Sequence, residues 1–285
     1  MLNDVVNYEL KNSIDSFIRR EIKAKDVFYI DEICKSDAYE FVRKYHYLGD
    51  AKFFCQQAFG LFSLDGNVLL GVATYSQPQG GYSLKGWFGI SNDNTFIYEL
   101  SRLCMLPLLN GTNATSYLLG NSIKIIKKQG KIKAIISLAN SGRHIGSIYQ
   151  VCNFKYYGLT PQRNIFYTST GKKNPRIVGK KNIHGVWVPM HRKHRYAYVL
   201  DDTIEILHKE QSRPSSQDYQ EDECCIGCGG SRKVFDRRFN EWYTCPICTG
   251  KVRLIEDGDD VDTTIEKDIL HNTKIIDEVE KYNLW

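Results

Sequence analysis

Apolar and polar residues follow one another along the chain in a pattern that predicts an α/β order of elements. Strand-like runs are expected at residues 26–29, 58–64, 68–78, 95–106, 133–139, 154–160 and 195–201. Helical spacing of apolar positions is expected at residues 1–25, 36–47, 113–129 and 145–154. Since strands and helices alternate in the middle of this order, we predict an α/β fold, a mixed sheet with crossover connections flanked by helices.

Turn and cap residues predict where some of these elements begin and end. Asp65-Gly66, between two apolar and β-rich runs, predicts a hairpin. Ser36 is expected to cap the second helix, with Glu40 near the capping-box position, and Gly49 is expected to end it. Residues 79–94 contain four glycines and are predicted to form a loop.

Composition divides the chain into a large domain and three C-terminal segments. Residues 1–200 form the expected catalytic domain, in which 161–195, rich in Gly, Pro and basic residues, is expected to be irregular and to face nucleic acid. Residues 201–223 are acidic and Ser-rich, as in a linker, and 224–253 hold a cysteine-rich module. Residues 254–285 are an acidic tail in which a helix could form.

Charge is strongly segregated although the net charge is only +5. No Asp or Glu occurs from Leu100 to Leu200, a stretch rich in Lys and Arg. This predicts a positive surface for a polyphosphate such as DNA, and the alternative is a basic face that has no ligand or is neutralised by the acidic tail. The expected DNA contacts are Arg143, Arg163, Lys172, Lys173, Arg176, Lys180, Lys181, Arg192, Lys193 and Arg195.

The sequence also predicts an intracellular, non-membrane protein. No apolar run approaches the roughly 20 residues that span a bilayer, and the polar start, MLNDVVNYELKNSIDSF, lacks the pattern of a secretory signal. The nine cysteines are therefore expected to be thiols or metal ligands.

Four of these cysteines have the spacing of a zinc ribbon. Cys225-x2-Cys228 is separated by 16 residues from Cys245-x2-Cys248. Each CxxC turn points two thiolates at one tetrahedral metal, and four thiolates make a closed, structural site. The alternatives are two redox pairs or a chance spacing, and the ribbon could contact phosphates or another protein.

Three polar clusters are candidates for catalysis. His46 lies at the end of a predicted helix, where its alternative role is packing. Glu99 and Arg102 interrupt an apolar strand. Glu99 could be a base or a metal ligand and Arg102 a charge-stabilising group, or the two could form a structural ion pair, and simple alternation puts them on opposite faces. Asn140 and His144 occupy a turn after a strand, where α/β proteins place ligands.

These clusters resemble, in order, the motifs of the phage Mom family. The matching elements are HY at residue 46, ELSRL, N-x-x-S-x-L, and S-x-A-N followed by H-x-G-x-IYQ-x-x-x-F-x-Y-x-G, over about residues 27–160. The resemblance implies a fold similar to GNAT acyltransferases and the conversion of DNA adenine to its N6-carbamoylmethyl form, which shields phage DNA from host restriction enzymes. It implies double-stranded DNA as partner and the cytoplasm of the infected bacterium as location.

Carried over by position, the family motifs imply a site lined by His46, Tyr47, Glu99, Arg102, Ser116, Asn140, His144 and Tyr149. Asn140 stands where family members tend to have an acid, which puts a base or metal-ligand role there in doubt. PLLNGTNATS (107–116) replaces the GNAT phosphate cradle, so the sequence does not support an acyl-CoA donor, and the donor stays open, as does a second metal in the pocket. The zinc ribbon is an appended module.

Three functions are compatible with these features. The first is a DNA-adenine-modifying transferase, with Glu99 or His46 as base and Arg102 stabilising charge on the donor. The second is a GNAT-like acyltransferase acting on a protein or small molecule. The third is a non-catalytic, DNA-binding antirestriction protein. The sequence leaves the donor, the DNA sequence preference and the oligomeric state open.

Overall fold

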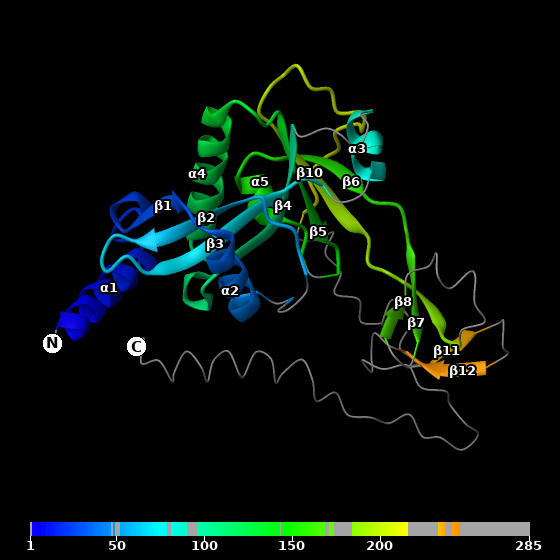
Figure 1. The fold of residues 1–285 in the computed structure, drawn as a ribbon, viewed down its shortest axis with the longest axis horizontal. Coiled ribbons are helices and arrows are strands. Elements are labelled where there is room, and N and C mark those ends of the chain that lie inside the picture. Colours follow the sequence, from blue (N-terminus) through cyan, green and yellow to red (C-terminus); the bar gives the residue numbers. More distant parts are fainter. Residues whose placement is uncertain are drawn as a thin grey trace.

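The computed structural model describes residues 2–46, 48, 52–78, 81–89, 96–142, 144–168, 171–173, 184–215, 233–236 and 241–245. Its main sheet has seven strands in the order β1-β2-β3-β4-β5-β10-β6 (Figure 1). Their bounds are β1 Phe28–Glu32, β2 Gln57–Ser63, β3 Leu69–Ser76, β4 Ile97–Met105, β5 Ala134–Asn140, β6 Lys155–Leu159 and β10 Lys193–Val199. The helices are α1 Leu2–Ile18, α2 Lys35–Tyr45, α3 Gly81–Phe88, α4 Ala114–Gln129 and α5 Ser147–Val151, with 3-10 turns at Ala24–Asp26 and Pro107–Leu109.

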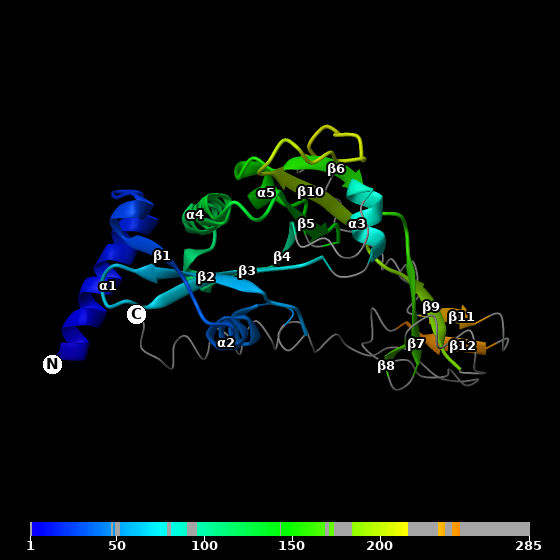
Figure 2. The ribbon, with the colours of Figure 1, turned by 45° about the horizontal axis from the view of Figure 1, so that its top comes forward.

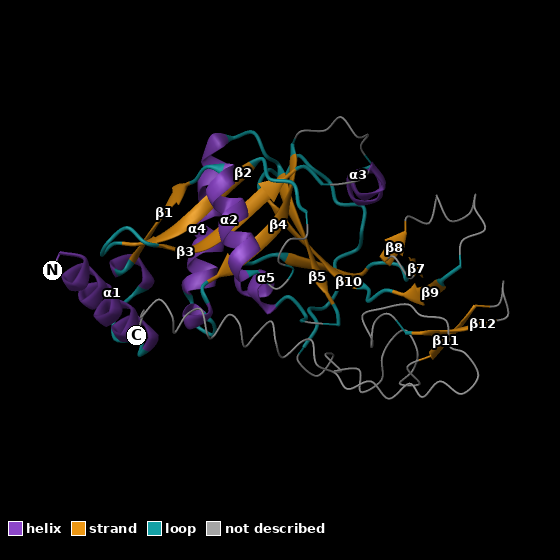
Figure 3. Ribbon diagram, turned by 60° about the horizontal axis from the view of Figure 1, so that its bottom comes forward, coloured by secondary structure: helices purple, strands orange, loops and turns teal. Residues whose placement is uncertain are grey.

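Helices cover both faces of this sheet. Helix α2 lies on one face and α4 and α5 lie on the other (Figure 2). The buried Tyr75 of β3 faces α4, where its hydroxyl lies 2.6 Å from Ser122 Oγ. Helix α1 lies at the end of the sheet near β1, where Phe17 packs edge-on against Phe28 with ring centroids 4.7 Å apart (Figure 3). The predicted α/β fold, a mixed sheet flanked by helices, is confirmed.

Strands β4 and β5 are parallel neighbours that pair over a short distance. Their register covers Ile97–Glu99 of β4 and 134–136 of β5, whereas every other neighbouring pair in the sheet is antiparallel. Beyond these residues β4 pairs only with β3, and β5 only with β10. In residues 100–105 of β4 and 137–140 of β5, the backbone N–H and C=O groups on the sides that face each other thus make no β4–β5 ladder bonds. Such backbone groups need other hydrogen-bond partners.

A second unit, which we call the arm, is inserted between β6 and β10. It consists of β7 Asn164–Thr168, β8 Gly171–Lys173 and β9 Val186–Pro189, in the order β8-β7-β9, all antiparallel. The hairpin of β11 Lys233–Asp236 and β12 Glu241–Thr244 packs on it. The arm lies at the end of the molecule opposite α1 (Figures 1 and 2).

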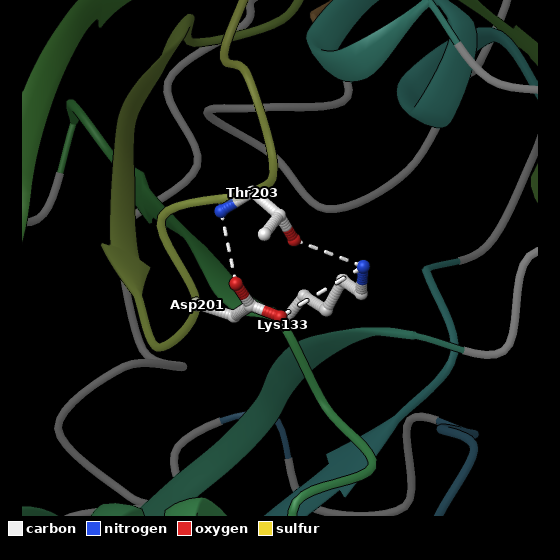
Figure 4. Close-up of polar contacts among 3 residues, drawn as sticks. All are labelled: Lys133, Asp201 and Thr203. Atoms are coloured by element: carbon white, nitrogen blue, oxygen red, sulfur yellow. Dashed lines mark hydrogen bonds and ion pairs between the residues drawn. The ribbon is translucent and has the colours of Figure 1, made fainter.

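Residues 201–215, which we call the strap, have no helix or strand but are tied to the main sheet. At their start, Lys133 Nζ lies 3.0 Å from Thr203 Oγ1 and 3.8 Å from Asp201 Oδ2 (Figure 4). Further along, the Leu207 amide donates to the Trp87 carbonyl at 2.7 Å. Ile204 and Ile206 pack with the cluster around α3. The strap therefore extends the core of the domain that contains the main sheet.

Most predicted elements are present, including the hairpin at Asp65-Gly66, where β2 and β3 pair and Gly66 has a φ of 80°. Three local expectations were wrong. Helix α2 begins at Lys35 after Cys34, without a side-chain cap, so Ser36 does not cap it. Residues 81–88 form α3 and not a loop. The 161–195 segment contains β7, β8 and β9, which its Gly, Pro and basic composition concealed. In the part of the chain that is described, no helix is long and apolar enough to cross a membrane.

Candidate active site

A β-bulge in β4 gathers the charged residues of the ELSRL motif on one face. Thr74 and Ser76, two residues apart in β3 and thus on one face, pair with Arg102 and Glu99. Since only one residue of β3 lies between Thr74 and Ser76 but two residues of β4 lie between Glu99 and Arg102, Ser101 is the extra residue of the bulge. The expectation that Glu99 and Arg102 lie on opposite faces was therefore wrong. Both lie on the face that α2 covers.

Short polar and aromatic contacts hold the bulge and the Arg102 side chain. Ser101 Oγ lies 2.7 Å from Ser76 Oγ across the two strands. Arg102 Nη1 donates to the Ser101 carbonyl at 2.6 Å, and its guanidinium carbon lies 4.9 Å from the centre of the Phe53 ring. Phe53 in turn packs against Tyr39 of α2, at 4.6 Å between ring centroids. The guanidinium is thus oriented on a rigid aromatic surface.

His46 is placed on the same face by the end of α2. It is the C-cap of the helix and is buried, and its amide donates to the Val42 carbonyl at 2.9 Å. Its Nδ1 accepts the Leu48 amide at 3.1 Å, so in the neutral ring the proton lies on Nε2. Tyr47 lies outside the described residues.

The turn after β5 is built on Asn140 and is clamped to the arm. Asn140 Oδ1 accepts the Gly142 amide at 3.1 Å, and the Asn140 carbonyl accepts the His144 amide at 3.1 Å. The Ser141 amide donates to the carbonyl of Arg192 at 3.0 Å. The ring of His191 packs on Gly142 so closely that a Cβ there would lie 2.5 Å from three ring atoms. His191, which sequence reasoning missed, thus links the arm to this turn.

Tyr149 belongs to an aromatic cluster on the α5 face. Its ring lies 5.2 Å from that of Tyr196, whose hydroxyl donates to the Ile145 carbonyl and accepts from Gln150 Nε2 at 3.2 Å. Burial is the main cause that raises the pKa of Tyr196 to about 12. At the edge of the cluster, the hydroxyl of Tyr156 lies 3.0 Å from the buried His194 Nδ1.

Ser116 lies apart from the Glu99 group, at the start of α4. Its hydroxyl donates to the Asn113 carbonyl at 2.8 Å. It lines a cavity of about 950 Å³ between the start of α4, α5 and residues 17–23. The described residues in its walls include Arg20 and Lys23 and no carboxylate. The structure therefore distributes the predicted catalytic residues over three places: the α2 face, the β5–α5 region and this cavity.

Two buried hydroxyls near the divergence of β4 and β5 have no hydrogen-bond partner among the described residues. Thr74 Oγ1 belongs to the β3 residue paired with Arg102. Ser137 Oγ lies on β5, one residue past the last pair with β4. A buried hydroxyl without a partner costs about 1–3 kcal/mol, so such atoms mark positions where a ligand or water completes the bonding. As common strand residues, neither could be singled out from sequence.

The structure describes only some of the residues that were predicted to bind DNA or metal. Arg163, Arg192 and Lys193 are exposed, and Arg195 is half-buried and packs over the Trp87 ring. Lys172 and Lys173 lie in β8. Arg143, Arg176, Lys180, Lys181, Cys225, Cys228 and Cys248 lie outside the described residues. Cys245 follows β12 and is fully buried. Within the described ranges, no three His, Cys, Asp or Glu side chains gather closely enough to hold a metal ion.

Residues 27–219 match the model of the family described as the Mom protein family. No curated protein matches the sequence. Among solved structures, the ribosomal-protein-S18-alanine N-acetyltransferase of Escherichia coli aligns at 12% identity and a TM-score of 0.37, covering 61% of this chain and 94% of its own. The spermidine/spermine N-acetyltransferase SpeG of Vibrio cholerae aligns at 9% identity and a TM-score of 0.39, covering 62% and 95%. With TM-scores this low, no conclusion rests on these likenesses.

Proposed function

Because the chain belongs to the Mom protein family, we propose that it is a transferase that modifies adenine in phage DNA by carbamoylmethyl-type transfer to the N6 amino group. The observation that carries the proposal is the bulge in β4. It supports a reacting centre because it puts a carboxylate, Glu99, and a guanidinium, Arg102, on one face beside the point where β4 and β5 part.

The proposed chemistry needs a base and a group that stabilises charge. The adenine amino group is a poor nucleophile because its lone pair is delocalised into the ring. As its nitrogen forms a bond to the donor carbon, the carboxylate of Glu99 takes the proton, and the donor's leaving group departs with the bonding electrons. Arg102, held by Phe53 and Ser101, stabilises negative charge that develops on the donor.

The donor binds, in this proposal, along the unpaired edges of β4 and β5. The backbone groups of residues 100–105 and 137–140 offer hydrogen bonds there, and Ser137 Oγ offers one more. The cavity beside Ser116, with Arg20 and Lys23 in its walls, suits an anionic part of such a donor. The aromatic cluster around Tyr149 closes the far side of β5.

Duplex DNA is the proposed substrate. The target base must leave the helix, at a cost of a few kcal/mol. The exposed Arg163, Arg192 and Lys193 supply phosphate contacts, as do the basic residues outside the described ranges. We further propose that Cys225, Cys228, Cys245 and Cys248 hold a structural zinc ion. The buried Cys245 directly follows the hairpin that packs on the arm, so this zinc would stabilise the arm.

The second candidate function is GNAT-like acyl transfer to a protein or small molecule, favoured by the cationic cavity beside Ser116. A non-catalytic DNA-binding antirestriction protein is the third. Acyl transfer predicts that the protein binds CoA. A pure binding protein predicts that Glu99→Gln leaves every property unchanged.

The test is mass spectrometry of nucleosides from DNA of bacteria that express the protein. We expect a new adenine-derived nucleoside whose mass names the transferred group. Glu99→Gln should abolish this nucleoside. The matched control is Glu205→Gln, which removes an exposed carboxylate of the strap and should leave the nucleoside unchanged. If the folded parent protein leaves the DNA of its host and of a phage grown in that host unmodified, the proposal that this chain modifies DNA is wrong.

A further inference from the structure

One face of the arm packs on the β11–β12 hairpin, and the other face carries the partly exposed Trp187. Val186 and Val188 of β9 are fully buried against Tyr243 of the β11–β12 hairpin. The hydroxyl of Tyr243 also lies 3.2 Å from His184 Nδ1. Trp187 lies between the two valines in β9, so its side chain points to the opposite face of the arm.

The Trp187 indole is both exposed and well supported. Trp187 is 39% exposed, although tryptophan is usually well buried. Beneath it lies Phe166 of β7, which is fully buried, with ring centroids 5.2 Å apart. The two residues are also directly paired in the β7–β9 ladder. The indole is thus fixed in place and offers a flat apolar surface that requires no ordering when a ligand binds.

The segment of the sequence that carries the indole is basic. The arm strands belong to the stretch from Leu100 to Leu200 that contains no Asp or Glu. Phe166 is paired with Lys173 of β8 on one side and with Trp187 of β9 on the other, so the three residues are cross-strand neighbours. At the root of the arm, Arg163 is exposed next to Met190, an exposed apolar residue whose amide donates to the Arg163 carbonyl at 2.8 Å. An aromatic and apolar surface among cations matches a nucleic acid strand with an accessible base.

The indole is also connected to the turn after β5. His191, whose ring packs on Gly142 in the turn after β5, follows Trp187 by only four residues. Four extended residues span at most about 13 Å, which is less than the width of a DNA duplex. A DNA strand that contacts the turn after β5 would therefore pass within reach of Trp187.

We propose that Trp187 is a stacking platform for a DNA base that has lost its pairing next to the modified adenine. The proposal rests on the proposed function in DNA modification. Stacking on the indole replaces part of the stacking that is lost when the helix opens. Apolar side chains such as Met190 can also hold an opened base step. The cations of the arm supply the phosphate contacts, whereas Trp187 supplies a contact to the base itself.

The salt dependence of binding separates a base contact from a phosphate contact. The zinc-loaded full chain is titrated, at several salt concentrations, with a fluorescent 20-base-pair duplex in which an abasic position replaces the central adenine, so that the thymine opposite has lost its pairing. We expect Trp187→Ala to weaken binding about tenfold at every salt concentration, with an unchanged slope of log affinity against log salt. Arg163→Gln should instead lower that slope by about 0.9.

Two control variants test whether the effect belongs to the ring. Trp187→Phe keeps a stacking surface and should bind within about threefold of the parent. Leu64→Ala removes another exposed apolar residue, in the β2–β3 hairpin at the far end of the molecule, and should bind as the parent does.

Two results would overturn the stacking platform while leaving DNA modification intact. One is unchanged affinity of Trp187→Ala. The other is a loss of affinity accompanied by a lower salt slope, because this would mean that Trp187 only maintains the arm and its phosphate contacts. Failure of the proposed function shows itself separately, since the parent protein would then leave the nucleosides unmodified in the mass spectrometric test.

Discussion

Replacing Gly142 by alanine tests whether the arm is mechanically linked to the turn after β5. The new Cβ would lie 2.5 Å from three ring atoms of His191, whereas carbon atoms normally approach to about 3.5–4.0 Å. The ring must therefore move by about 1 Å. Its backbone resists, because the Ser141 amide is bonded to the next residue, Arg192. Overpacking of this kind lowers the free energy of unfolding by about 1–3 kcal/mol.

The double variant makes the reasoning quantitative. Gly142 has no positive φ, so alanine is compatible with its backbone and reduces the entropy of the unfolded chain, which stabilises by about 0.4–1 kcal/mol. Once His191 is also replaced by alanine, the clash disappears and Gly142→Ala should become neutral or stabilising. We expect a coupling of at least about 1 kcal/mol between the two sites.

The measurement is urea unfolding of the parent, the two single variants and the double variant, followed by circular dichroism. DNA modification is measured on the same four proteins. We expect Gly142→Ala to lower modification and His191→Ala to restore part of it in the double variant. Equal destabilisation by Gly142→Ala in both backgrounds would show that His191 is not what the new methyl group meets.

Three further predictions concern other parts of the molecule. Gly146→Ala should lower the free energy of unfolding by about 3 kcal/mol in urea, since Gly146 has a φ of 81° and its Cβ would meet the Tyr196 ring at 2.6 Å; a loss below about 1 kcal/mol would contradict this. Burial and then Arg195 lower the pKa of His208 from its usual 6.5, so its neutral form is favoured in the folded protein. Its contribution to stability should be complete above pH 6.5 and decline as the pH falls through the lower folded value, and in unfolding experiments His208→Gln should remove this decline. Phe166→Ala should lower the stability of the arm by about 3–5 kcal/mol and speed hydrogen exchange in β7 and β9, with β2 and β3 as unaffected controls.

Local signals in the sequence were sufficient for elements whose residues determine their own conformation. The Asp65-Gly66 hairpin is one example, because a glycine with positive φ and two flanking β-rich runs are enough to specify it. Helix α3 was missed for the opposite reason. Its glycine-rich segment is a poor helix former, but Leu84, Trp87 and Phe88 bury themselves with residues of β4 and β5, and this tertiary packing overrides propensity.

The candidate site was predictable as a set of residue types but not as an arrangement. Glu99 and Arg102 stand out because charges are unusual in an apolar strand, yet their common face depends on where β4 bulges against β3, a pairing that no local pattern reveals. His191 lies 49 residues from Gly142 in the sequence and makes its contact only because β10 pairs with β5. Thr74 and Ser137 could be identified as candidates only from the structure, which buries their hydroxyls with no hydrogen-bond partner in the described part of the chain.

The position of β10 has a consequence for the order in which the chain can fold. Strands β5 and β6 do not touch in the ladder, because β10 lies between them and pairs with both. Until residues 193–199 arrive, the nascent chain presents two open sheet edges, which are prone to pair with other molecules. The pairing of β7 with β9 brings residues 163 and 190 together, so a formed arm would shorten the loop that must close when β10 docks and would lower the entropy cost of that step. Formation of the arm thus helps to position β10 between β5 and β6. A variant in which β7 and β9 cannot pair should therefore aggregate more during synthesis.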